Sequence, residues 1–288
     1  MKDRSLVFFT ISAQMAVGAL LIIGGIYERL ALIAGTAIAI SLIRVCLIMI
    51  GLLIFLSLLA SLFHLGNPQN AWRTLSNLRS SWLSREVLFT LLFAGLIGIL
   101  ILGQRLQWDD RPINTLLARL AGLCGLALVY SMARVYMLRT TPAWNSWLTP
   151  ASFFTTTFLL GCLFVGAVLA VQSVFLPFEF SLIIRTVLNW LGAGLILLLL
   201  VEFILIPLQL SSMANHGIED QTGRPLIQLY LFRLVPILTG VTLVTILFFS
   251  STPLNIPAAL TVLAGFGLAL TSEVFGRISF YESRQPRL

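Results

Sequence analysis

Charged residues are scarce in this sequence. Lys, Arg, Asp and Glu together make up 10% of the 288 residues, whereas soluble globular domains typically contain about 25%. Hydrophobic residues make up 58% of the chain, and the mean hydropathy is +0.99. This balance excludes a soluble globular fold and predicts an integral membrane protein.

Cysteine and histidine are also few, with three Cys and two His in the chain. Cys46, Cys124 and Cys162 lie in apolar runs and lack the paired spacing of iron–sulfur or zinc ligands. A b-type haem needs two imidazoles from facing helices, but only His64 ends an apolar run, while His216 lies in a polar connection. We therefore expect neither haem nor an iron–sulfur cluster in this chain.

The net charge of +7 comes from 18 Lys and Arg against 11 Asp and Glu. Most of the arginines lie in short connections between apolar runs, which is where membrane topology concentrates them. The positive charge therefore does not indicate nucleic-acid binding.

Eight apolar segments approach the length of about 20 residues that a membrane-spanning helix needs. They cover approximately residues 5–26, 44–63, 87–103, 112–133, 151–171, 182–206, 225–249 and 254–272. The sequence thus predicts an all-α integral membrane protein, a helix bundle of eight transmembrane helices with both termini on the same side. We expect residues 1–288 to form a single polytopic membrane domain.

Residues 30–43 are apolar as well, but they lie between the pair Glu28 and Arg29 and the next charge, Arg44. We expect this stretch to be a connection that dips into the membrane interface. The segment 273–281, which contains charged residues, is expected to be a tail after the last span.

The longest polar interruption covers residues 64–86. Gly66 and Pro68 should end the preceding helix, because Gly accepts a left-handed cap conformation and Pro cannot continue the hydrogen-bond ladder. His64 is therefore expected in the last helical turn of that span.

Residues 71–82 show apolar positions at helical spacing with Arg73 and several serines on the opposite side, which predicts an amphipathic interfacial helix. Ser84 is expected to cap the next helix and to place Glu86 in its first turn. A histidine and a carboxylate would then bracket an interfacial helix at one membrane surface.

Other polar and aromatic residues need a separate interpretation. Tyr136, Trp144 and Trp147 follow the fourth span and are typical of an aromatic belt at headgroup depth. Glu202 lies inside a predicted span, where a carboxylate is costly and by default a functional candidate. The sequence shows no partner for it, and its role stays unassigned.

Five short motifs occur along the chain. They are His-Leu-Gly-x-Pro at 64–68, Leu-Ser-x-Glu at 83–86, Arg-Val-Tyr at 134–136, Trp-x-x-Trp-x-Thr-Pro-x-x-Phe-Phe at 144–154 and Glu-x-x-Gly-Arg-x-x-Phe-Tyr at 273–281. In order and spacing they resemble the membrane anchor subunit of bacterial dimethyl sulfoxide reductase, the DmsC family. The apolar stretch 28–43 departs from that family, which has a charged loop there.

The resemblance implies a multi-pass subunit of the bacterial inner (cytoplasmic) membrane that oxidises menaquinol. Its implied partners are a four-cluster iron–sulfur subunit, which receives the electrons, and a molybdopterin catalytic subunit. By the same resemblance His64 and Glu86 match the positions tied to quinol binding. Arg73, Tyr136 and Trp144 are further candidates for contact with the quinol. The terminal electron acceptor is left open, because that chemistry belongs to another subunit.

Quinol oxidation releases two electrons and two protons. A histidine and a carboxylate suit this chemistry, one as acceptor for a hydroxyl proton and the other as a relay to water. Both residues also suit a structural role, because a cation at a helix C-terminus or an anion at an N-terminus is favoured by about 0.3–1 kcal/mol. Two other functions stay open, namely a small-solute transporter and a purely structural anchor.

The charges and the resemblance disagree on orientation. Most Lys and Arg residues lie on the face shared with the N-terminus, so the positive-inside rule assigns that face to the cytoplasm. The resemblance implies the periplasm, because the family's catalytic partner is exported by a twin-arginine signal and must lie close to the quinol site. We expect a periplasmic face.

Overall fold

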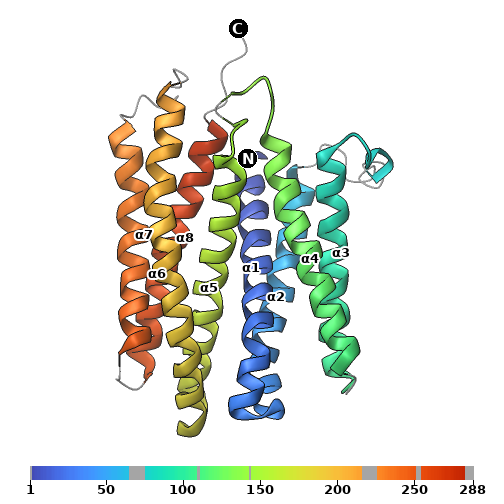
Figure 1. Ribbon diagram of the computed structural model, residues 1–288, viewed down its shortest axis with the longest axis vertical. Helices are drawn as coiled ribbons and strands as arrows, with labels where there is room; N and C mark the ends of the chain where they lie inside the picture. The colour runs from blue at the N-terminus through green and yellow to red at the C-terminus, as the bar shows by residue number, and fades with distance from the viewer. Residues whose placement is uncertain are drawn as a thin grey trace. The chain divides into compact units, whose positions relative to one another are not determined.

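The computed structural model describes residues 2–64, 75–108, 111–142, 144–215, 226–250 and 254–282. Within these ranges all regular secondary structure is helical (Figure 1). The helices are α1 (Lys2–Ala34), α2 (Thr36–His64), α3 (Trp82–Arg105), α4 (Arg111–Tyr136), α5 (Leu148–Phe175), α6 (Phe178–Asn215), α7 (Leu226–Phe249) and α8 (Ile256–Glu282).

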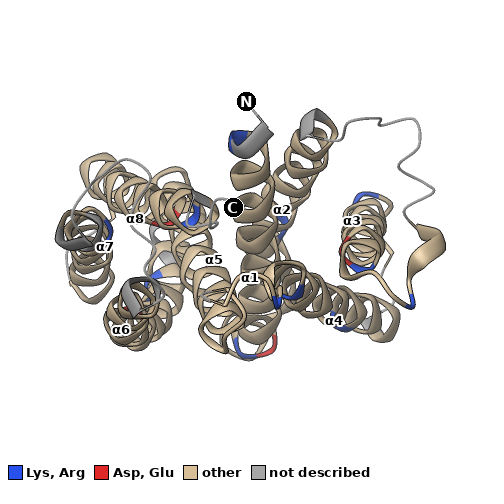
Figure 2. Cartoon of the chain, turned by 90° about the horizontal axis from the view of Figure 1, so that it is seen from above, with Lys and Arg blue, Asp and Glu red and all other residues tan. Residues whose placement is uncertain are grey.

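All eight helices are long and apolar enough to cross a membrane, with spanning segments of 19 to 33 residues. Few positions along them carry charge (Figure 2). Helices are the expected form, because a bilayer core offers no water to pair with backbone N–H and C=O groups. The predicted all-α membrane fold with eight spans is confirmed.

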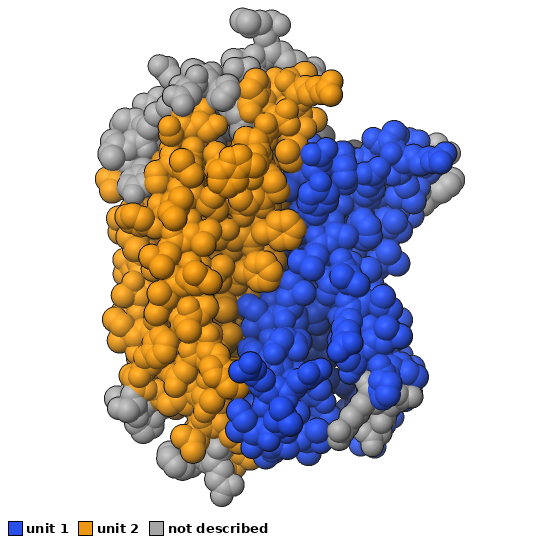
Figure 3. Space-filling view, viewed as in Figure 1, with its two compact units in different colours: residues 1–135 blue, residues 136–288 orange. Residues whose placement is uncertain are grey.

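The chain divides into two compact units, residues 1–135 with α1 to α4 and residues 136–288 with α5 to α8 (Figure 3). In unit 1, α2 packs along α1, and the Ser57 hydroxyl donates a hydrogen bond of 3.0 Å to the Phe9 carbonyl. Helix α4 approaches α1 and α3 at Gly125, where an added β-carbon would lie 2.8 Å from Val17 and 3.2 Å from Phe93.

In unit 2, α5 packs on α6 and α8, and α7 packs on the same two helices, so that the four form a closed ring of neighbours. Helices α7 and α8 come closest at a pair of glycines. A β-carbon at Gly265 would lie 2.7 Å from the Gly240 carbonyl oxygen, and one at Gly240 would lie 3.1 Å from the Ala269 amide nitrogen. Small residues of this kind allow membrane helices to touch through their backbones.

The predicted interfacial connection over residues 30–43 is wrong. Helix α1 continues to Ala34 and α2 begins at Thr36, so only Gly35 separates two long apolar helices. Gly35 has φ +84°, a conformation that costs an L-residue with a β-carbon. The apolar stretch therefore lengthens both helices.

The predicted interfacial helix over residues 71–82 does not form where the structure describes it. Residues 71–74 lie outside the described ranges, 75–77 form a single 3₁₀ turn, and α3 already begins at Trp82. The predicted cap is also wrong, because the hydroxyl of Ser81 accepts the Ser84 amide at 3.2 Å. The apolar spacing leading to Trp82 continues into α3, and periodicity alone could not separate the two.

The predicted tail over 273–281 is part of α8, which runs to Glu282. Hydropathy falls at Glu273 and Arg277, and the drop suggested the end of a span. Both side chains are buried inside the protein, so they do not need to leave the membrane helix.

Adding one carbon at the α7–α8 contact should destabilise the protein. We expect Gly240→Ala to lower the free energy of unfolding by about 1–3 kcal/mol through overpacking. Gly267→Ala on α8 is the control, because an added β-carbon there meets nothing within 4 Å. The melting temperature in detergent can be followed through the reaction of buried Cys162 with a thiol dye. Equal melting temperatures for the two variants would contradict the close contact.

Eight crossings should leave both ends of the chain in one compartment. Reporter proteins fused after residue 4 and after residue 288 are therefore expected to report the same side of the membrane. Opposite readings would mean that one of the eight helices does not cross.

Candidate functional site

The predicted quinol residues of unit 1 lie at consecutive helix ends. His64 is the last residue of α2, and α2 packs against α3, which carries Glu86. Glu86 is only 7% exposed and sits in the second turn of α3, one turn later than predicted. The His64 side chain and all of Arg73 lie outside the described part of the structure, so their meeting with Glu86 stays a prediction.

The start of α3 is fixed by a cluster around Trp82. The Arg85 guanidinium carbon lies 4.1 Å from the centre of the indole ring and that of Arg134 lies 5.0 Å from it, while Tyr130 meets the ring edge-on at 5.7 Å. Arg85 also donates hydrogen bonds to the backbone carbonyls of residues 78–79, at 2.9 and 2.8 Å. These contacts hold the preceding turn and α4 against the helix that positions Glu86.

Tyr136 and Trp144 belong to unit 2, whereas Glu86 belongs to unit 1. Ring centroids of Trp144, Phe280 and Tyr281 lie 5.0 to 5.9 Å from that of Tyr136. Trp144 is 5% exposed and stacks on Phe280 at 5.1 Å, whereas Trp147 is 66% exposed. The predicted belt position therefore suits Trp147, while Trp144 packs inside the protein.

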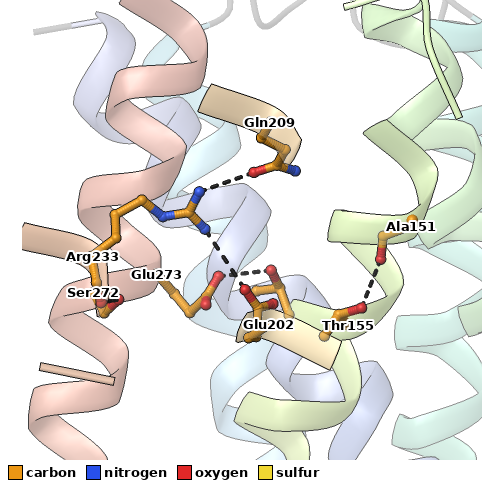
Figure 4. A network of polar contacts seen from close by, with 8 residues as sticks. Ala151, Thr155, Glu202, Gln209, Arg233, Ser272 and Glu273 are labelled. Atoms are coloured by element: carbon orange, nitrogen blue, oxygen red, sulfur yellow. Dashed lines mark hydrogen bonds and ion pairs between the residues drawn. The ribbon is translucent and has the colours of Figure 1, made fainter. Parts of the chain in front are cut away.

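Unit 2 also holds a buried cluster of charges, which we call the charge cluster. Its members are Glu202 on α6, Arg233 on α7, and Glu273 and Arg277 on α8, each between 2% and 6% exposed. Figure 4 shows three of them turned toward one another. An Arg233 nitrogen lies 4.0 Å from the Glu202 carboxylate, and another donates to the Gln209 side-chain oxygen at 2.9 Å.

The other two members face α5. The Thr156 hydroxyl donates to Oε2 of Glu273 at 2.7 Å. The Arg277 guanidinium carbon lies 3.7 Å from the centre of the Phe153 ring, a cation–π contact. The charge cluster therefore ties all four helices of unit 2 together through side chains that have left water.

Gly276 makes room for this arrangement. A β-carbon there would lie 2.6 Å from Cζ of Arg233, too close for any residue other than glycine without moving the guanidinium. The Gly-Arg pair of the last sequence motif thus acquires a physical reason, since one residue admits the α7 arginine and the other carries a charge of α8.

A small cavity adjoins the charge cluster and measures about 10 Å³. This volume is close to the space of one water molecule and far below the few hundred Å³ of a typical small-molecule site. It is lined by Thr149, Ser152, Phe153, Gln209, Arg233, Glu273, Gly276, Arg277 and Phe280. As it stands, this cavity does not fit a quinol ring.

The sequence analysis missed the charge cluster except for Glu202. One signal was available, because Arg233 and Glu202 are opposite charges within two consecutive predicted spans, and such residues tend to pair. Among the described residues, no three His, Cys, Asp or Glu side chains gather as metal ligands. The expectation of no haem and no iron–sulfur cluster stays a prediction.

Comparison with known proteins gives consistent relatives. The sequence is 33% identical over 172 residues to a membrane-complex component of Escherichia coli named for anaerobic dimethyl sulfoxide reductase, covering 59% of this protein and 58% of the relative. It is 31% identical over 159 residues to the protein of the same name from Haemophilus influenzae, covering 55% and 56%. A component of sulfite dehydrogenase from Allochromatium vinosum is 32% identical over 113 residues, 35% of each protein. The matched regions thus span less than two thirds of these relatives.

The sequence profile of a single family extends further than these pairwise matches. The profile described as DMSO reductase anchor subunit (DmsC) matches residues 1–282 and therefore includes all eight helices. The chain belongs to the DMSO reductase anchor subunit (DmsC) family.

Proposed function

We propose that this chain is the membrane anchor and menaquinol-oxidising subunit of a molybdoenzyme reductase complex in the bacterial inner membrane. The observation that carries the proposal is the family match over residues 1–282, combined with a buried carboxylate, Glu86, on the helix that follows His64. Its partners would be a four-cluster iron–sulfur subunit and a molybdopterin catalytic subunit.

His64 and Glu86 would divide the proton chemistry of quinol oxidation. Each quinol hydroxyl must lose a proton as the electrons leave, so each needs an acceptor within hydrogen-bond reach. The imidazole of His64 can accept one proton and pass it to water at the end of α2. The Glu86 carboxylate can accept the other, and its burial keeps water from competing for the hydroxyl.

The remaining candidates have weaker support. Arg73 would add a donor to the quinol oxygens, and this role stays a proposal. The rings of Tyr136 and Trp144 pack against other aromatic residues of unit 2, which favours a structural role over quinol contact. The terminal substrate of the complex is left to the catalytic subunit, since relatives carry both dimethyl sulfoxide reductase and sulfite dehydrogenase names.

Two other functions remain as alternatives. A transporter would be expected to place unpaired polar groups along a path near the bilayer midplane, whereas Arg233 lies against Glu202 and Gln209. A purely structural anchor would need no buried carboxylate at Glu86. The variants below separate that anchor from a quinol-oxidising subunit.

Removing either proton acceptor should stop quinol oxidation without releasing the complex from the membrane. We expect His64→Ala and Glu86→Gln each to lower quinol-dependent turnover about 10²-fold or more. Activity with an artificial donor that reduces the soluble subunits directly should persist. Both activities can be measured in the same membrane preparation.

Glu28→Gln is the matched control, because Glu28 is an exposed carboxylate of unit 1 whose contact is a 3.8 Å ion pair with Arg119. Its quinol turnover should stay normal. If either His64→Ala or Glu86→Gln kept normal turnover, that residue would lose its proposed role, and normal turnover in both would favour the purely structural anchor.

The end of unit 1 that carries His64 is proposed to face the periplasm, against the positive-inside count. A Ser80→Cys variant places a thiol in the exposed turn before α3. It should react in intact cells with a membrane-impermeant thiol reagent. Leu106→Cys, at the exposed opposite end of α3, should react only after the inner membrane is opened. The reverse pattern would show that the arginine count sets the orientation.

A further inference from the structure

The charge cluster of unit 2 contains buried polar atoms that lack a hydrogen-bond partner among the described residues. Nε of Arg233 is one and Oε1 of Glu273 is another, and both are inaccessible to solvent. Leaving such an atom unpaired costs about 1–3 kcal/mol, and more for a charged group. Both side chains line the same cavity of about 10 Å³.

These two atoms are complementary, because Nε–H of arginine donates a hydrogen bond and a carboxylate oxygen accepts one. A water molecule does both and fits the cavity's volume, whereas a larger ligand does not. The hydroxyls of Thr149 and Ser152 also line the space, which brings the number of polar neighbours to the two to four that a buried water requires.

We propose that this cavity is a binding site for one ordered water that bridges Nε of Arg233 and Oε1 of Glu273. The water accepts from the guanidinium and donates to the carboxylate. It thereby completes a chain of contacts from Glu202 through Arg233 and the water to Glu273 and Thr156, which reaches all four helices of unit 2.

Water is favoured over an ion by the charge of the surroundings. Two arginines and two glutamates meet here, and their formal charges cancel, so neither an anion nor a cation gains a net attraction. The site shares no residue with the proposed quinol chemistry of His64 and Glu86, because all of its residues belong to unit 2.

X-ray radiolytic labelling tests the site, since brief pulses make hydroxyl radicals from bound water and these oxidise the nearest side chains. The full-length chain would be exposed in lipid nanodiscs and its peptides analysed by mass spectrometry. Phe153 and Phe248 are both fully buried phenylalanines of unit 2, but only Phe153 lines the cavity. We expect Phe153 to be oxidised several-fold faster than Phe248, and equal rates would overturn the proposal.

Two variants assign the water to its partners. Glu273→Leu removes the accepting oxygen and should lower the Phe153 rate to that of Phe248. Thr156→Val removes only the bond to Oε2, the other carboxylate oxygen, and should leave the Phe153 rate unchanged. An unchanged rate in Glu273→Leu would overturn the assignment to Glu273, and the wild-type comparison decides the site even where that variant fails to assemble.

Discussion

Hydrocarbon offers no hydrogen-bond partner, and this constraint governs the described structure. Backbone groups are paired within helices, and charges that enter the membrane segments must find partners inside the protein. The contact of Arg233 with Glu202 and the bond from Thr156 to Glu273 are the clearest results. Breaking one partner of such a buried set leaves an uncompensated charge, typically at a cost of about 3–5 kcal/mol.

The same constraint explains how the helices are held together. Lipid tails are as apolar as leucine, so burial of apolar side chains adds little drive between membrane helices. Unit 2 instead combines close backbone contact at Gly240 and Gly265 with polar contacts at the charge cluster. Gly276 joins the two devices, because the absence of its side chain admits the Arg233 guanidinium against α8.

The two units therefore invite different functional interpretations. Unit 1 carries the residues proposed for quinol chemistry, with Glu86 buried on a helix whose start is clamped around Trp82 by Arg85 and Arg134. Unit 2 carries a set of charges that contact one another and a cavity fit for a single water. A buried carboxylate next to a helix end is suited to exchange protons, whereas mutually neutralised charges are suited to fix packing.

The sequence by itself determined the number and type of the elements, because long apolar runs in water-free surroundings have helices as their available form. Its motifs also identified the family, and placed His64 and Glu86 at neighbouring helix ends. It failed where polarity and membrane position separate: Glu273 and Arg277 looked like a tail, and residues 30–43 looked like an interfacial connection. Only the tertiary structure decided that Glu202 meets Arg233 and that Trp144 is buried on Phe280. The physical reason is that pairing between helices depends on three-dimensional proximity, which helical periodicity within one segment does not encode.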